Sequence, residues 1–149
     1  MQNLEKLSAK GRLHVVLTGP DGAVKETHDL RNLVVDSGLA FIVSRMNATT
    51  YDVMSHMSLG EGTTAAAAGD TALESEVAAS RVALDSVTVA ANQITYVASF
   101  GAGVGTGSIT ESGIFNDAAA GTMLCRTVFP VVTKQAGDSM TVTWTITVQ

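Results

Sequence analysis

Residues 139–148 read SMTVTWTITV, and their strict alternation is the feature that decides the fold. Successive side chains of a strand point to opposite faces, so this stretch predicts a β-strand with one apolar and one hydroxyl-lined face. We expect the apolar row to fill a sandwich core, while the threonine row could face solvent or a neighbouring subunit. The apolar row is Met140, Val142, Trp144, Ile146 and Val148, and the hydroxyl row is Ser139, Thr141, Thr143, Thr145 and Thr147.

Short strands separated by turn residues are also predicted along the rest of the chain. Gly19-Pro20-Asp21-Gly22 predicts the turn of a hairpin, since proline presets the bend and Asp-Gly tolerates positive φ. The apolar parity changes within 81–89, which predicts a β-bulge at Asp85-Ser86, and Pro130 predicts a bend or a sheet edge. The other expected strands are 11–17, 23–28, 54–59, 93–100, 109–115 and 123–129, and 33–35 is a short apolar segment.

One helix is expected, from Gly38 to about Met46, with Asp36 or Ser37 as its N-cap. Its apolar residues at helical spacing predict one face packed on a sheet, and they are Leu39, Ile42, Val43 and Met46. The segment 60–70 reads as an exposed loop because glycines and threonines flank its four alanines, and 71–77 could form a short helical turn.

Eight or nine short strands with one short helix predict a mainly β chain, an antiparallel β-sandwich or jelly roll. The 149 residues suit a single domain, expected over 11–149. Residues 1–10 have weak helical spacing and are expected to form an N-terminal arm, either disordered or ordered on a partner.

Composition narrows the possible partners. The net charge is −5 and the nine basic residues are scattered singly, so no nucleic-acid surface is expected. No apolar run approaches the ~20 residues of a membrane helix, and the N-terminus lacks the apolar core of a signal peptide. We therefore expect a protein that is made and used in a cytoplasm, or that leaves it only by lysis. The single cysteine, Cys125, cannot form an intramolecular disulfide and is expected to be buried in a strand.

Catalytic, metal and cofactor motifs are not evident, so we expect neither an enzyme nor a cofactor. The glycines of GAGVGTG (101–107) have the wrong spacing for a nucleotide-binding loop and lead into a strand. His14 and His28 could lie across one hairpin and bind a metal, although surface positions are the simpler interpretation. Glu111 stands alone in a strand pattern. A carbohydrate-binding module would group aromatic residues on one face, whereas Trp144 falls in the apolar row.

Three segments together resemble a family of small structural proteins of tailed bacteriophages. The segments are MSHMSLGEGTTAAAAGDTAL (54–73), ITYVASFGAGVGTGSITESGIFN (94–116) and GTMLCRTVFPVVTKQAGDSMTVTWTITV (121–148). With the N-terminal hairpin and 31–46, the resemblance covers most of the chain. The chain departs from the family pattern at Ser112, where alanine is frequent, and at Gln135 in the last turn.

The resemblance implies a virion component, with members described as capsid cement or decoration proteins and as tail- or fibre-associated proteins. We favour a cement protein on the exterior of an HK97-type icosahedral capsid, made in the host bacterial cytoplasm, with the major capsid protein and a second copy of itself as partners. A collar or tail-fibre adaptor is the alternative. The expected interface residues are Leu4, Leu7, Glu61, Thr63, Thr64, Val104 and Thr106.

Overall fold

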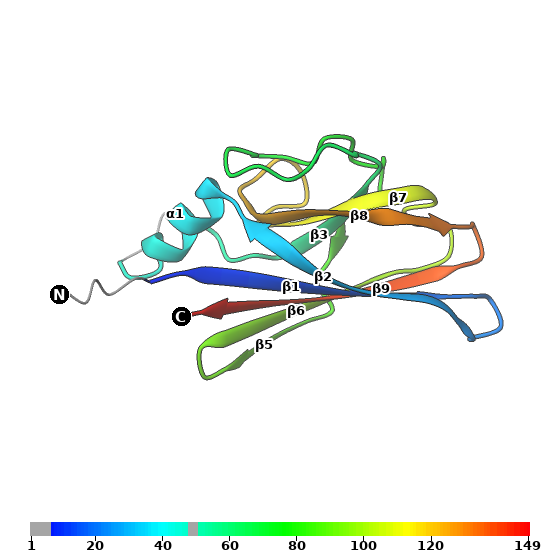
Figure 1. Ribbon diagram of the computed structural model, residues 1–149, viewed down its shortest axis with the longest axis horizontal. Coiled ribbons are helices and arrows are strands. Elements are labelled where there is room, and N and C mark those ends of the chain that lie inside the picture. The colour runs from blue at the N-terminus through cyan, green and yellow to red at the C-terminus, as the bar shows by residue number, and fades with distance from the viewer. Residues whose placement is uncertain (1–6, 48–50) are drawn as a thin grey trace.

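The computed structural model describes residues 7–47 and 51–149, in which antiparallel strands join into one curled sheet (Figure 1). The order in the sheet is β4-β3-β7-β8-β2-β1-β9-β6-β5. The strands are β1 (Ala9–Thr18), β2 (Val24–Val34), β3 (His56–Gly60), β4 (Val82–Ala83), β5 (Ser86–Ala90), β6 (Gln93–Phe100), β7 (Gly107–Phe115), β8 (Met123–Lys134) and β9 (Ser139–Val148), and the helix is α1 (Asp36–Ser44).

The sheet folds over on itself at β2. Most of β2 pairs with β1, but its last residues, Leu33 and Val34, pair with Arg126 and Cys125 of β8. The lower layer (β2, β1, β9, β6 and β5) therefore faces the upper layer (β8, β7, β3 and β4), and the main core lies between them. The predicted fold class, a mainly β antiparallel sandwich with one short helix, is confirmed.

Strand β9 occupies the middle of the lower layer, between β1 and β6. Trp144 is fully buried and pairs with Leu13 on one side and Tyr96 on the other. Met140 to Ile146 of the apolar row are buried, while the threonine row is half-buried on the outer face. The predicted division of β9 into a core face and an outer face is confirmed. Cys125 is buried as expected, and this burial raises the pKa of its thiol well above the ordinary value.

The helix begins earlier than predicted and turns a different face inward. Neither Asp36 nor Ser37 caps it, because Val35 is the N-cap and the Ser37 hydroxyl donates to the Met123 carbonyl at 2.8 Å. Gly38 lies directly over the Leu124 carbonyl, where a Cβ would overlap that oxygen. Phe41, on the same helix, is buried in the core. The predicted packing face is confirmed only at Ile42, which is half-buried against the core. It was wrong for Leu39, Val43 and Met46, which are exposed.

The parity change within 81–89 marks a crossing between layers. Leu84 N–H donates to Ser55 of the upper layer at 2.9 Å, and Asp85 N–H donates to Val97 of the lower layer at 2.7 Å. Strand β4 therefore ends in one layer and β5 begins in the other. The prediction of a single strand with a β-bulge at Asp85-Ser86 was wrong.

Three further boundaries differ from the sequence expectation. Residues 71–77 contain no helix, and the expected segment 33–35 is mainly the end of β2. Strand β8 continues through Pro130 to Lys134, with a shift of register opposite β7 at the predicted bend. Strand β1 begins at Ala9, inside the expected arm, and Ser8 exchanges backbone hydrogen bonds of 2.7 and 2.8 Å with Gln149.

Candidate functional site

A buried ion pair lies at the centre of the upper layer. Glu111 on β7 accepts a hydrogen bond from Nε of Arg126 on β8 at 2.8 Å, and both side chains are buried. The strand pattern around Glu111 gave no indication of this pair. Because removing two charges from water is costly, such a pair persists only when its remaining donors and acceptors are also satisfied.

The segment 62–75 supplies those partners. The Glu111 carboxylate accepts three backbone N–H groups, from Gly62 at 3.0 Å, Glu74 at 3.1 Å and Ser75 at 2.8 Å. Arg126 also donates to the Thr64 carbonyl at 3.0 Å and to Asp70 Oδ2 at 2.8 Å. The loop expected to be merely exposed is thus fastened to the sheet from below.

Glycines in this segment allow the close approach. A Cβ on Gly60 or Gly62 would lie well inside van der Waals contact of Glu111 Oε1. Asp70 accepts the Ala67 backbone N–H at 2.9 Å, and this bond together with Arg126 lowers the pKa of its carboxyl. We name the set Glu111, Arg126 and Asp70 the loop clamp.

A second anchor holds the chain just before β4. Arg81 makes two hydrogen bonds to the Glu76 carboxylate, at 2.8 and 2.9 Å, and its guanidinium lies 3.7 Å from the centre of the Phe115 ring. Arg81 also donates to the Ala120 carbonyl at 2.6 Å. Ser58 donates to the same Glu76 carboxylate, so β3, β4 and the turn after β7 are tied together.

A third anchor spans the β8–β9 turn, from Lys134 at the end of β8 to Asp138 just before β9. The buried Lys134 donates to the carbonyls of Gly101 at 2.8 Å and Asp138 at 2.7 Å, and burial lowers the pKa of its amine. The Asp138 carboxylate accepts from Lys25 at 2.9 Å and from Gln135 N–H at 2.9 Å. These bonds fix the start of the 101–107 loop.

Four basic residues take part in the loop clamp and the two other anchors: Lys25, Arg81, Arg126 and Lys134. Three other basic residues lie on β1 and β2, where Arg12 is the direct register partner of Arg31 and Lys10 lies two residues before Arg12. Arg12 approaches Asp29 at 3.9 Å with its side chain 73% exposed. Within 7–47 and 51–149, no salt bridge joins Lys10 or Arg31 to an acidic side chain.

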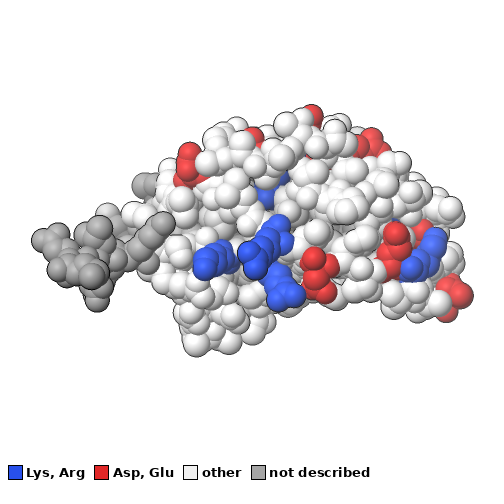
Figure 2. All heavy atoms as spheres, viewed as in Figure 1, with Lys and Arg blue, Asp and Glu red and all other residues white. Residues whose placement is uncertain are grey.

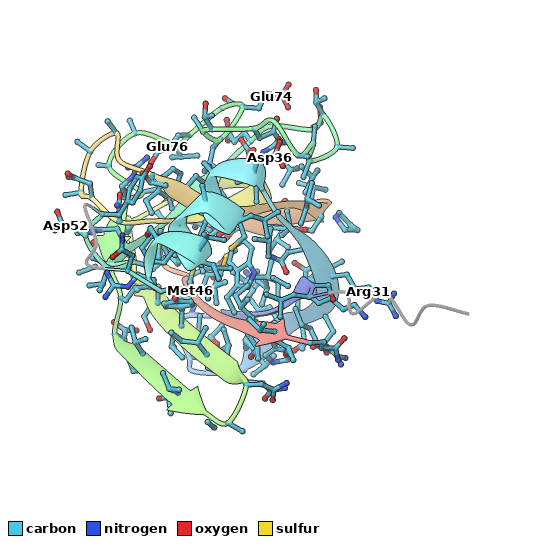
Figure 3. All side chains as sticks on the ribbon, turned by 90° about the vertical axis from the view of Figure 1, so that its left-hand side faces the viewer. Arg31, Asp36, Met46, Asp52, Glu74 and Glu76 are labelled. Carbon is cyan, nitrogen blue, oxygen red and sulfur yellow. The ribbon has the colours of Figure 1, made fainter. Side chains whose placement is uncertain are left out.

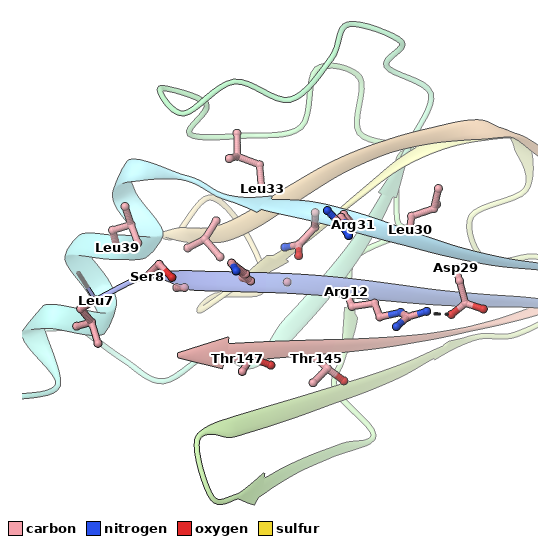
Figure 4. Close-up of a pocket in the computed structure, with 15 residues that line it drawn as sticks. Leu7, Ser8, Arg12, Asp29, Leu30, Arg31, Leu33, Leu39, Thr145 and Thr147 are labelled. Atoms are coloured by element: carbon pink, nitrogen blue, oxygen red, sulfur yellow. Dashed lines mark ion pairs between the residues drawn. The ribbon is translucent and has the colours of Figure 1, made fainter. Parts of the chain in front are cut away.

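These cations border a groove of about 810 Å³ at the α1 end of the molecule (Figure 4). The groove forms because β2 leaves β1 after Asn32 to pair with β8, so the two backbones separate. Gly11 leaves room there, and the Asn32 side chain occupies the space that a Cβ on Gly11 would need. Apolar residues complete the wall, and they include Leu7, Leu33 and Leu39. We name this feature the β2 groove.

The β2 groove is therefore cationic and apolar together. Figure 2 shows one group of basic side chains over β1 and β2 with an acidic side chain beside it, while other basic side chains of this face lie apart from the group, at the right-hand end and in the upper part. Like charges directly opposite one another on a sheet are unfavourable, and departures from such local rules concentrate at functional sites. We therefore take the opposed Arg12 and Arg31 as the candidate site. The arrangement suits an anionic, partly apolar protein surface, and it contains no nucleophile–base pair.

Some of the residues predicted for the interface lie at the β2 groove and the hollow beside it, and the others lie elsewhere in the fold. Leu7 lines the β2 groove with 74% of its surface exposed, and Thr63 lines an adjoining hollow of about 380 Å³ beside Arg31 and Leu33. Thr64 instead bonds the Glu74 carboxylate through both its backbone N–H and its hydroxyl, at 2.8 and 2.9 Å.

The remaining predicted residues lie elsewhere. Glu61 accepts a hydrogen bond from Ser108 N–H at 3.2 Å, and Val104 packs against the main core. Thr106 is exposed on the same loop as Val104. Leu4 lies outside the described residues. The structure thus brings Leu7 and Thr63 to one surface and separates Val104 and Thr106 from it.

Sequence reasoning missed this group, because Arg31 is distant along the chain from Lys10 and Arg12 and only the pairing of β1 with β2 brings it opposite them. The turn at Gly19–Gly22 was the available signal, since counting outward from it places Arg12 and Arg31 near each other.

The alternative of a metal site on the hairpin is not supported. His14 pairs with Asp29, whereas His28 pairs with Val15, whose side chain is in the core, so the two histidines point to opposite faces. In the part of the chain that is described, no cluster of three or more His, Cys, Asp or Glu could hold a metal ion.

No protein-family model, curated protein or solved structure matches this chain. Among the described residues, no helix has the length and apolar character needed to cross a membrane.

Proposed function

We propose that this chain is a non-enzymatic virion protein, a cement protein that binds the exterior of an HK97-type phage shell and bridges major capsid subunits. The resemblance to tailed-phage structural proteins motivates the proposal. Its three sequence blocks meet at the loop clamp: Gly62, Thr64 and Asp70 come from the first block, Glu111 from the second and Arg126 from the third. The similar motifs therefore encode a rigid loop, which suits a display scaffold.

The observation that carries the proposal is the opposed pair Arg12 and Arg31 at the rim of the β2 groove. On a chain of net charge −5, three neighbouring cations without strong internal partners form a local site for carboxylates. Leu7, Leu33 and Leu39 supply apolar area beside them. A capsid surface with acidic residues around an apolar side chain has the matching chemistry.

Binding of this kind stabilises the shell by mass action, because a protein that binds the assembled shell and not the dissociated subunits shifts the equilibrium towards assembly. Many copies on one shell make the effect multivalent. The anchors that fix the loops reduce the entropy lost when the surface docks.

Copy number distinguishes this proposal from a collar or tail-fibre adaptor. A cement protein occurs in hundreds of copies per virion, whereas an adaptor occurs in a few. Quantitative staining of whole virions on a gel, with the major capsid protein as internal standard, measures the ratio. A stoichiometry of a few copies, together with antibody labelling at the tail, overturns the cement proposal and supports the adaptor.

A further inference from the structure

Strand β5 stands at the end of the sheet, and among the described residues its only strand partner is β6. Figure 1 places β5 at the lower border of the molecule, below β6, and the same green hairpin lies at the lower border in Figure 3. All residues of β5 are exposed, and its sequence, SVTVA, contains no charge and no proline. Charged residues and proline are what normally protect an open edge strand from the addition of another strand, and β5 has neither.

The valines of β5 extend the core face of the lower layer. Val87 pairs with Tyr96 and Val89 with Ile94, and cross-strand partners lie on the same face of a sheet. Tyr96 is buried, and Ile94 packs against the core. Val87 and Val89 are nevertheless 48% and 71% exposed, so the upper layer does not cover this part of the inner face.

The backbone N–H and C=O groups of β5 that β6 does not bond lie symmetrically on either side of Thr88. The two-residue turn Ala91-Asn92 makes Ala90 and Gln93 a pair that exchanges both hydrogen bonds. The pattern alternates, so Thr88 also bonds towards β6, while Val87 and Val89 direct their N–H and C=O groups outwards.

The sequence of β5 is symmetric about the same residue. Valines flank Thr88 on both sides, and the small residues Ser86 and Ala90 flank the valines. An antiparallel copy centred on Thr88 therefore places each Val87 opposite Val89 of the second copy, with main-chain hydrogen bonds at both positions. The two Thr88 side chains meet at the axis, a favourable cross-strand pair.

We infer that β5 pairs with β5 of a second copy about a two-fold axis through Thr88, which joins two lower layers into one continuous sheet. A two-fold interface uses the same patch on both subunits, and this register satisfies the edge of each copy at once. The seam is short compared with a standard protein interface, so the dimer is weak in dilute solution and forms at high local concentration. The inference does not depend on the proposed capsid function.

Disulfide trapping tests the register directly in the full chain. Thr88→Cys places two sulfurs at the axis, where Cα atoms of such a pair lie roughly 4.5 Å apart, within disulfide range. Ser86→Cys is the matched control, because its two copies lie about 13 Å apart. Cys125 is buried and does not compete. We expect T88C to form a covalent dimer under mild oxidation and S86C to remain monomeric. Equal cross-linking of both variants, or of neither, overturns the inference.

Charge substitution gives an independent test by sedimentation over a concentration series. V87K/V89K places lysine opposite lysine at both positions, and we expect it to weaken the dimer by on the order of tenfold or more. V87K/V89E places lysine opposite glutamate and restores dimerisation. Val24→Lys, at another exposed valine, leaves it unchanged. If the two double variants weaken the dimer equally, the proposed register is wrong. If wild type is monomeric at every concentration, or if a different chain adds to β5, the proposed partner, a second copy, is wrong.

Discussion

At the residue scale, the fold depends on a few side chains buried at the junctions between strands. Trp144 is the largest fully buried side chain and lies between Leu13 and Tyr96. Its Nε1 has no hydrogen-bond partner among the described residues. Its contribution to stability is therefore apolar packing, with nothing gained from the indole N–H.

Replacement of Trp144 with alanine should lower the free energy of unfolding by about 3–5 kcal/mol, because it leaves a large cavity in the core. Trp144→Phe is the matched control: it keeps an aromatic ring in the core, leaves a smaller cavity and removes the unpartnered N–H, so we expect a smaller loss than for alanine. Urea denaturation measures both. If alanine left folding intact and abolished binding to a partner, the assignment of the two faces of β9 would be reversed.

Replacement of Arg126 with methionine should cost about 3–5 kcal/mol, because Glu111 would remain buried without its counter-ion. The double variant E111Q/R126M removes both charges, and we expect it to recover part of that loss. Urea denaturation gives the energies, and limited proteolysis of 62–75 reports release of the loop. Additive losses in the double variant would show that the two residues do not act as a pair.

At the scale of elements, α1 is positioned by a glycine. A helix interior normally gains about 1 kcal/mol when glycine becomes alanine. At Gly38 the sign should reverse, since a Cβ would overlap the Leu124 carbonyl oxygen of β8. We expect Gly38→Ala to destabilise the protein by about 1–3 kcal/mol. Ala40→Gly on the exposed side provides the reference for propensity alone. A Gly38→Ala variant more stable than wild type in thermal unfolding would contradict the close approach.

Elements with local signals could be predicted from the sequence, and those defined by distant partners could not. Alternation over ten residues identified β9, and turn chemistry identified the β1–β2 hairpin. The crossing at Leu84–Asp85 looked like a bulge because side-chain parity cannot distinguish a slip from a change of layer. The pairing of Glu111 with Arg126 was missed because the two residues lie on different strands, and the same holds for Arg12 and Arg31.

At the scale of the whole molecule, carboxylates that accept ion pairs and backbone hydrogen bonds hold the segment 62–75, the chain before β4 and the β8–β9 turn, so the stability should depend on pH. Lys25 and the Gln135 N–H lower the pKa of Asp138, and the Ala67 N–H and Arg126 lower that of Asp70. Burial acts to raise the pKa of Glu76, but the hydrogen bonds from Arg81 and Ser58 outweigh it and lower the pKa.

These folded-state pKa values lie below the ordinary 3.8 and 4.5. As the pH falls through that range, the unfolded chain therefore binds more protons than the folded chain does. Stability should therefore be level above about pH 6 and decline as the pH falls below about 5 towards and through the lowered values. The urea midpoint at several pH values checks this. Asp138→Asn should show a shallower decline, and a midpoint independent of pH would contradict the role given to the anchors.

Shell binding through the β2 groove is the central claim, and binding to emptied or expanded phage shells tests it most directly. The measurement compares wild type, R12Q/R31Q, and a control, A118E/A119E, that lowers the net charge by the same amount in an exposed turn. We predict that wild type and control saturate the shells and raise their melting temperature, while R12Q/R31Q binds on the order of tenfold more weakly. Equal binding by all three proteins, or no binding by wild type, would contradict the account.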